Sequence, residues 1–276
     1  MLVAALGTAG CSINLSSLSP PSEPEKQEPS QVTSSHDIRS LTEAIKNNPN
    51  DPQAYNSRGS VLAQAGKTEE ALADFNQAVS LDPNFAQAFA NRGLIYRKTN
   101  RPDLAMADYN RAITLDPSHA LAYLGRGLIH KAMNEPTEAL EDLNKAISLR
   151  PDSAEAYYNR ALLYQGEKQH ELAVEDFTSA NGLTPQQAEP LLGRALSYLA
   201  LGKAKEAATD LDEAVQADPR NSQIWITRGL AYERLGDKNK AASCYARAIS
   251  LRPNDDAARG GFARVGGKAG QNGDTF

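Results

Sequence analysis

The sequence repeats itself every 34 residues, and this period constrains the fold more than any other feature of the chain. Six units follow one another without insertion or deletion, at residues 52–85, 86–119, 120–153, 154–187, 188–221 and 222–255. Each unit closes on a proline: Pro83, Pro117, Pro151, Pro185, Pro219 and Pro253. A fixed period of roughly 20–50 residues is typical of arrays in which one small structural unit stacks on the next.

The spacing inside each unit predicts two helices that pack against each other. In the second unit, Phe89, Gly93 and Tyr96 are four and three residues apart, which places them on one face of a helix. Ala105, Tyr109 and Ala112 lie on one face of a second helix in the same way. Small residues at these positions let two helix axes approach closely, so we expect an all-α fold built from helical hairpins.

The small and aromatic positions of all six units resemble the tetratricopeptide repeat. The small residue of the first helix is Gly59, Gly93, Gly127, Ala161, Ala195 or Gly229, and the aromatic position before it holds Tyr55, Phe89, Tyr123, Tyr157, Leu191 or Trp225. This resemblance implies an α-solenoid, a right-handed superhelix of hairpins with a concave groove lined by the first helices.

Both ends of the array are predicted to carry caps. Leu41, Ala44 and Pro49 lie one period before Phe75, Ala78 and Pro83, so residues 38–49 are expected to form a lone second helix. Residues 256–276 are expected to form a short C-terminal cap followed by a disordered tail.

The N-terminal segment resembles a bacterial lipoprotein signal. Residues 1–10 are small and apolar and end in Ala9-Gly10 before Cys11, which the resemblance implies is the lipidated residue. Thr8 replaces the usual leucine, and no Lys or Arg precedes the apolar run, so its charged n-region is expected to be truncated. The alternative is an unprocessed N-terminus with an incidental cysteine.

Residues 11–37 are rich in Ser, Pro and Glu, which predicts a disordered tether between the anchor and the array. Lipidation at Cys11 implies a lipid anchor to a membrane and a periplasm-facing location in the cell envelope. Ser12 after the cysteine resembles lipoproteins of the outer membrane, if the source cell is Gram-negative.

An arginine precedes the small residue in every unit, and an aspartate follows 16 residues later in five of them. The arginines are Arg58, Arg92, Arg126, Arg160, Arg194 and Arg228, and the aspartates are Asp74, Asp108, Asp142, Asp176 and Asp210. We expect a ladder of ion pairs between adjacent helices rather than a row of arginines that catches anionic ligands. The sixth unit has Cys244 in place of the aspartate, which predicts either a buried small residue or a reactive thiol with a lowered pKa beside an unpaired Arg228.

The resemblance also implies which residues face the groove. The expected partner-binding residues are Asn91, Leu94, Arg97, Lys98, Leu128, Lys131, Tyr158, Asn159, Leu162, Gln165, Leu196 and Leu230. The leucines among them suit apolar anchors of an extended or helical peptide, or else they pack between neighbouring first helices. The Lys and Asn pattern that family members use to grip the carboxylate tails of chaperones is missing.

Composition and motifs argue against several other functions. The net charge of −5 gives no general affinity for nucleic acid. The four histidines have no metal-ligand spacing, and neither a glycine-rich phosphate loop nor a GxSxG serine occurs. The sequence therefore predicts no enzyme, no cofactor and no small-molecule substrate.

We expect a membrane-anchored scaffold or adaptor that binds protein or peptide partners in the bacterial cell envelope through its concave groove. It resembles envelope lipoproteins of this repeat class, such as the adaptor NlpI and the pilotins of type IV pili. Three alternatives remain open. The first is a structural lipoprotein that self-associates into a homo-oligomer, or a pilotin-type assembly factor. The second is a protein that recognises cell-wall glycan, and the third is a cytoplasmic co-chaperone-like adaptor if Cys11 is not lipidated.

Overall fold

The computed structural model describes residues 29–267, and within this range the chain forms helices and no strand. In chain order the helices are α1 (Pro29–Asn47), α2 (Pro52–Gln64), α3 (Thr68–Leu81), α4 (Ala86–Lys98), α5 (Pro102–Leu115), α6 (Ala120–Ala132), α7 (Pro136–Leu149), α8 (Ala154–Gly166), α9 (His170–Leu183), α10 (Ala188–Ala200), α11 (Ala204–Ala217), α12 (Ser222–Arg234), α13 (Lys238–Leu251) and α14 (Asp256–Arg264).

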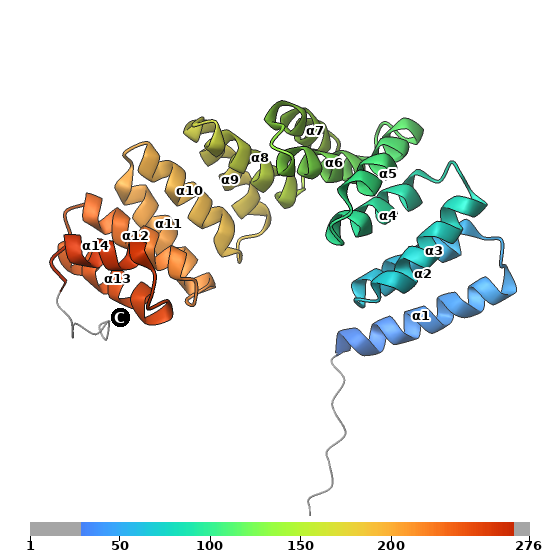
Figure 1. Cartoon of the computed structure of the whole chain (residues 1–276), viewed down its shortest axis with the longest axis horizontal. Coiled ribbons are helices and arrows are strands. Elements are labelled where there is room, and N and C mark those ends of the chain that lie inside the picture. The colour runs from blue at the N-terminus through green and yellow to red at the C-terminus, as the bar shows by residue number, and fades with distance from the viewer. Residues whose placement is uncertain (1–28, 268–276) are drawn as a thin grey trace, which may run out of the picture.

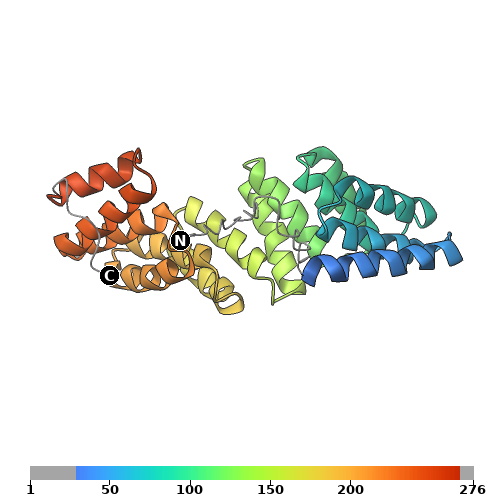
Figure 2. The ribbon, with the colours of Figure 1, turned by 90° about the horizontal axis from the view of Figure 1, so that it is seen from below.

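The helices stack side by side into an elongated arch, with α1 at one end and α14 at the other (Figure 1). The view from below shows the same order along the long axis (Figure 2). Each 34-residue unit is one antiparallel hairpin, from α2–α3 to α12–α13. The all-α solenoid predicted from the period is therefore confirmed.

Each hairpin turns through one residue with a left-handed backbone. Gly66, Gly202 and Gly236 hold this position with φ between 75° and 80°, and the other three hairpins use Asn100, Asn134 and Lys168 at 57° to 63°. Glycine and asparagine tolerate this conformation, whereas a lysine is strained in it. After the turn, Pro102 and Pro136 begin α5 and α7, at the helix position where the missing N–H has no cost.

In four hairpins the core joins a small residue of the first helix to a ring of the second, and Leu143 and Leu211 replace the ring in the other two. A Cβ on Gly93 would lie 3.0 Å from Cε1 of Tyr109, so the ring fills the space that the glycine leaves. The ring of Tyr109 also reaches forward into the next hairpin, where a Cβ on Gly125 would clash with it. Ala105 and Ala112 are fully buried beside Tyr109. Each hairpin is therefore packed both internally and against its successor.

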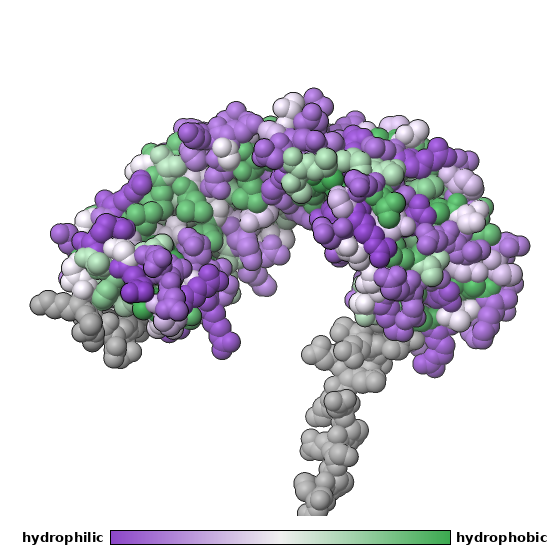
Figure 3. Space-filling view, in the orientation of Figure 1, coloured by the Kyte–Doolittle hydropathy of each residue, from purple (hydrophilic) through white to green (hydrophobic). Residues whose placement is uncertain are grey.

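The arch curves because the two rows of helices pack differently. First helices of successive hairpins contact one another, for example α4 with α6 and α10 with α12, whereas no two second helices do so in the described part of the chain. The first helices therefore form the inner, concave row. The space-filling view shows the hollow of the arch and hydrophobic side chains gathered over α10 among hydrophilic ones (Figure 3).

Helix α1 starts earlier than the sequence predicts. It begins at Pro29 rather than at residue 38, so residues 29–37 are helical instead of belonging to the tether. A proline suits the first helical position, and adding residues to an existing helix is far easier than nucleating one. At the other end, the chain does form a nine-residue helix, α14, despite its glycines.

The predicted signal peptide, Cys11, the tether up to residue 28 and the tail from residue 268 lie outside the described residues. In residues 29–267 the structure has no helix that is both long enough and apolar enough to cross a lipid bilayer.

Candidate functional site

The predicted ladder of arginine–aspartate pairs is present in five hairpins. Each arginine donates from Nε and from Nη2 to the two carboxylate oxygens of its aspartate, at 2.7–2.8 Å. The pairs are Arg58–Asp74, Arg92–Asp108, Arg126–Asp142, Arg160–Asp176 and Arg194–Asp210. Hydrogen bonding to the carboxylate raises the pKa of each of these arginines. The charge of each arginine is therefore balanced by its aspartate within the hairpin rather than free to bind an anionic ligand.

The arginines also bond to the preceding hairpin, which the sequence reasoning missed. Nη1 of Arg92 donates to Asn76 at 2.9 Å, and Nη1 of Arg126 donates to Asn110 at 2.8 Å. The acceptors recur with the same period of 34 residues: Thr42, Asn76, Asn110, Asn144 and Thr178. That recurrence of short polar residues was the available signal. Each arginine therefore ties two hairpins together.

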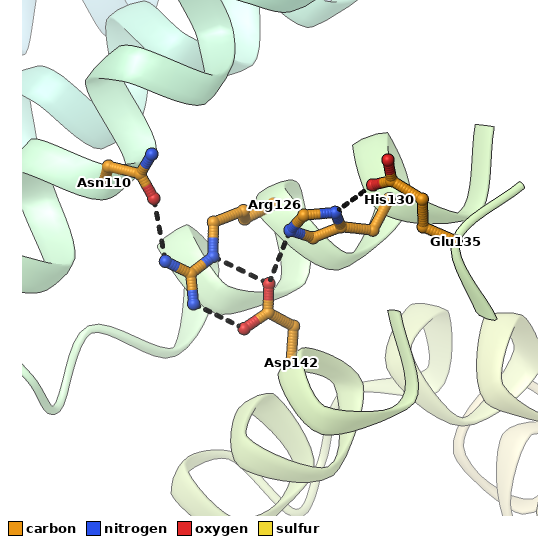
Figure 4. A network of polar contacts seen from close by, with 5 residues as sticks. All are labelled: Asn110, Arg126, His130, Glu135 and Asp142. Carbon is orange, nitrogen blue, oxygen red and sulfur yellow. Dashed lines mark hydrogen bonds and ion pairs between the residues drawn. The ribbon is translucent and has the colours of Figure 1, made fainter. Parts of the chain in front are cut away.

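The third hairpin extends this network with a histidine (Figure 4). Nδ1 of His130 lies 2.7 Å from Oε2 of Glu135, and its Nε2 lies 3.9 Å from the Asp142 carboxylate that Arg126 already holds. Most other hairpins have a tyrosine at this position, for example Tyr96, which lies over the guanidinium of Arg92. This cluster is part of the ladder.

Arg228 has a carboxylate partner although its own hairpin lacks one. Asp212 of the preceding hairpin accepts from its Nε at 2.7 Å, and Asp212 occupies the position held elsewhere by Asn or Thr. Sγ of Cys244 lies 3.7 Å from Nη1 of Arg228 and is 1% exposed. Burial raises the pKa of the Cys244 thiol to about 11. The interpretation as a reactive thiol beside an unpaired arginine is therefore wrong, and the buried small residue is correct.

Several polar residues predicted to face the groove link neighbouring first helices instead. Asn91 donates to Asn56 at 2.9 Å, and Lys131 donates to Asn159 at 2.7 Å. Gln165 donates to the carbonyl of Gly193 at 3.0 Å and to the hydroxyl of Ser197 at 2.9 Å. Lys131 is also half-buried, which lowers its pKa. These bonds hold the concave row in register.

Of the leucines predicted to face the groove, some pack between neighbouring helices and others stay available as anchors for a peptide. Leu128, Leu162 and Leu230 are half-buried and pack against the clusters between neighbouring helices. Tyr158 lies edge-on against Phe177, with ring centroids 5.8 Å apart. Leu196 stays 37% exposed, and Lys98 is exposed as well. The remaining predicted residues, Leu94 and Arg97, lie together with Asn91 at a pocket.

This pocket of about 90 Å³ lies on the concave row, where α4, α6 and α8 come together. Its lining combines the three predicted residues with others from four helices: Ala90, Tyr109, Leu121, Leu124, Gly125 and Glu155. Tyr109 was not among the predicted groove residues because it occupies a core position of a second helix. Glu155 was not among them because it lies two hairpins further along the chain.

Sequence models described as the tetratricopeptide repeat or TPR repeat match residues 40–73, 59–100, 86–119, 132–167, 154–187 and 192–256. Together these matches cover well over half of the chain. The chain belongs to the tetratricopeptide repeat (TPR) family. TPR proteins are in general protein-interaction scaffolds rather than enzymes, so this TPR chain is a protein-binding scaffold in that broad sense.

Solved structures with the same fold include PilF of Pseudomonas aeruginosa, with 23% identity and a TM-score of 0.69 over 77% of this chain and 97% of that one. PilW, described as a widely conserved type IV pilus biogenesis factor, has 17% identity and a TM-score of 0.65 over 76% and 97%.

A chain of the APC/C hetero-tetramer Cut9–Hcn1 has 16% identity and a TM-score of 0.69 over 86% of this chain. This TPR array spans only 46% of the length of that chain. No curated protein sequence matches the chain. At these identities the likenesses establish the fold of the TPR array alone.

Proposed function

We propose that this TPR array is an adaptor that binds an extended segment of a protein partner along its concave row, with the pocket at α4, α6 and α8 as the main anchor. The observation that carries the proposal is the composition of that pocket. Leu94, Leu121 and Leu124 surround buried polar atoms of Arg97 and Tyr109. Binding sites typically combine apolar walls with a few oriented polar groups in this way.

Hydrogen bonds hold the helices around the pocket to one another. The ladder fixes each first helix to its own second helix and to the preceding hairpin. The bond from Lys131 to Asn159 fixes α6 to α8. A preformed groove orders few of its own side chains on binding, which leaves more of the contact energy for affinity.

Introducing a charge at the pocket wall tests the groove proposal. Leu94→Asp places a carboxylate at the pocket wall, and Leu104→Asp is the matched control on the second helix α5, where Leu104 is 50% exposed. We expect crosslinked affinity capture from intact cells to retain partner proteins for wild type and Leu104→Asp but to lose them for Leu94→Asp. Circular dichroism must first show that both variants fold. If both variants capture the same proteins as wild type, the concave pocket is not the contact surface.

We further propose that lipidation at Cys11 anchors the adaptor to a membrane of the cell envelope, with the TPR array facing the periplasm, and at the outer membrane if the cell is Gram-negative. The small and apolar residues 1–10 before Cys11 support this location. Anchoring would raise the local concentration of the adaptor near envelope partners.

Metabolic labelling with an alkyne fatty acid tests the anchor. We expect the label and the membrane-bound fraction to be lost together in Cys11→Ser. An unlabelled wild-type protein in the soluble fraction would instead favour a cytoplasmic co-chaperone-like adaptor.

A pilotin-type assembly factor is the second candidate, supported by the likeness to PilW, a type IV pilus biogenesis factor. An NlpI-like envelope adaptor would differ from it in the captured proteins. Pilus-assembly components lost with Leu94→Asp would favour the pilotin role. A mass in light scattering that grows with protein concentration would favour a self-associating structural lipoprotein.

A further inference from the structure

We infer that the pocket at α4, α6 and α8 takes a neutral carboxamide side chain, that of glutamine or asparagine, from the bound segment. This inference rests on the proposed function of the concave row and names the side chain that its anchor recognises. It follows from two buried hydrogen-bond donors at the pocket, on Arg97 and Tyr109, that lack acceptors. It follows also from the charges of Arg97 and Glu155, which already offset each other.

The floor of the pocket is the phenol of Tyr109. Its ring passes from the second helix α5 between α4 and α6, because Gly125 has no side chain to block it. The residue is 1% exposed, yet it is part of the pocket lining. Phe177 reaches past Gly193 in the same way two hairpins later, without a hydroxyl. The hydroxyl of Tyr109 is therefore not needed for this packing.

Two polar atoms at the pocket lack partners among the described residues: the hydroxyl oxygen of Tyr109 and Nε of Arg97. Burial is the main reason that the pKa of Tyr109 is raised, so the phenol keeps its proton and remains a donor. Nε of arginine can only donate. Arg97 lies beside the phenol and opposes the rise in its pKa, yet neither buried atom has a hydrogen-bond partner of good geometry. A buried donor without an acceptor is costly, and an oxygen from a ligand would satisfy both atoms.

The repeat explains why Nε of Arg97 has no hydrogen-bond partner. The next hairpin has Lys131 at the same position, and Lys131 donates to Asn159 on the following first helix. The residue that would serve Arg97 in this way is Gly125, which has no side chain. The glycine that admits the Tyr109 ring therefore also removes the acceptor of Arg97.

The last hairpin shows the same arrangement with its acceptor in place. Tyr245 corresponds to Tyr109, and its hydroxyl donates to Oε2 of Glu233 at 2.8 Å. Arg264 donates to the same carboxylate at 3.0 and 3.1 Å. There, one oxygen-bearing group satisfies a tyrosine and an arginine together. At the pocket, Arg97 stands at the position of Glu233, so that acceptor must come from a ligand.

The charge balance selects a neutral acceptor over a carboxylate. Nη2 of Arg97 already lies 4.0 Å from Oε1 of Glu155, so the lining carries one positive and one negative charge. A ligand carboxylate would bring a second negative charge beside Glu155. A carboxamide offers its oxygen to Arg97 and Tyr109 and its NH₂ group to Glu155, while its methylene groups contact Leu94 and Leu124.

Three probes with side chains of similar length test the inference by NMR titration of the isotope-labelled protein: N-acetylglutamine methylamide, N-acetylglutamate methylamide and N-acetylnorleucine methylamide. We expect the glutamine probe to bind most tightly and to shift the backbone amides of Leu124 and Gly125. Tyr109→Phe should weaken it about tenfold, the value of roughly one hydrogen bond. Tyr198→Phe, on α10 outside the pocket, should leave its affinity unchanged.

Tyr109→Phe also has a stability readout that separates binding from structure. Because it removes an unpaired hydroxyl and Phe75 and Phe177 fill the same position elsewhere, the variant should be at least as stable as wild type in urea. A clear loss of stability would give the hydroxyl a structural role and overturn the inference.

Other outcomes also overturn it. Tighter binding of the glutamate probe would make the pocket a carboxylate site. Equal binding of the norleucine probe would show that the donors of Arg97 and Tyr109 do not contribute to binding. No chemical-shift change with any probe would exclude a site for a side chain. If Leu94→Asp still abolishes partner capture in these cases, the groove proposal stands and only the carboxamide inference fails.

Discussion

Arg228 keeps a carboxylate partner because two positions of the repeat have exchanged roles. In other hairpins the aspartate lies on the same hairpin as the arginine, and a neutral Asn or Thr approaches from the preceding one. In the last hairpin the carboxylate of Asp212 comes from the preceding one, and Cys244 takes the same-hairpin position. One carboxylate per arginine is retained, since a second would be repelled by the first and a missing one would leave a half-buried cation unpaired.

The exchange predicts a strong coupling between positions 212 and 244. Cys244→Asp alone places two carboxylates on Arg228 and buries one of them, so it should lower the free energy of unfolding by about 1–3 kcal/mol. Adding Asp212→Asn rebuilds the arrangement of the other hairpins and should restore most of the loss. A double-mutant cycle from urea unfolding measures the coupling. Additive effects of the two changes would contradict the exchange.

His119 predicts a pH dependence of stability. Its Nδ1 accepts from the backbone N–H of Ala122 at the start of α6, and its Nε2 lies 3.2 Å from Oε1 of Gln87. Burial lowers the pKa of His119 in the folded protein, more than the opposing charge of Asp116 raises it. The unfolded chain therefore takes up the proton first, and the stability from neutral His119 is lost as pH falls below about 6.5 towards the folded pKa.

His119→Ser isolates this effect, because Ser153 caps α8 in the same way without titrating in this range. Between about pH 7.5 and about pH 5, the urea midpoint of wild type should fall more than that of His119→Ser. The other titrating groups are common to both proteins and cancel in the difference. Equal falls in the two proteins would show that His119 contributes nothing to the pH dependence.

At the scale of the helices, the hairpin turns show where the repeat carries strain. Lys168 adopts φ of 63° where three other hairpins have glycine. Lys168→Gly should therefore raise the free energy of unfolding by about 1 kcal/mol, since a left-handed conformation costs a side-chain-bearing residue about that much.

Asn134→Gly is the control at the same position of another hairpin, where φ is 61°. Asparagine tolerates the left-handed region, so the change should have an effect of only a few tenths of a kcal/mol. Thermal or urea unfolding of the two variants beside wild type makes the comparison. A larger gain for Asn134→Gly than for Lys168→Gly would contradict the strain argument.

At the scale of the whole molecule, each hairpin is stabilised by its neighbours. The short helices at the two ends therefore affect the stability of the hairpins beside them. Helix α14 covers the apolar cluster of the last hairpin, where Trp225 and Tyr245 pack with Ala258 and Phe262. Ending the chain at Asn254 should speed amide hydrogen exchange in α12 and α13 while leaving α2 to α5 unchanged, because stability in such arrays is passed between nearest neighbours.

The N-terminal hairpins serve as the internal control for this truncation, since they lie at the far end of the arch from α14 (Figure 1). A uniform rise in exchange across all hairpins would mean that the array unfolds as a single cooperative unit, contrary to the nearest-neighbour argument.

The sequence by itself determined the hairpins, their number and the ladder. Tyr109, Gly93 and Arg92 recur in kind at intervals of 34 residues, and packing inside one hairpin depends only on residues close in the chain. The start of α1 was predicted nine residues late, because the period cannot show where a helix outside the repeat begins.

Only the tertiary structure decided which concave residues are used by the scaffold and which stay available. Lys131 and Arg97 hold the same position in the repeat, yet one is paired with Asn159 and the other opens onto a pocket. That difference depends on Gly125 in the next hairpin and on Glu155 two hairpins away. Contacts between hairpins follow from how the array curves, and the curvature is set by the packing of all neighbours together rather than by any one repeat.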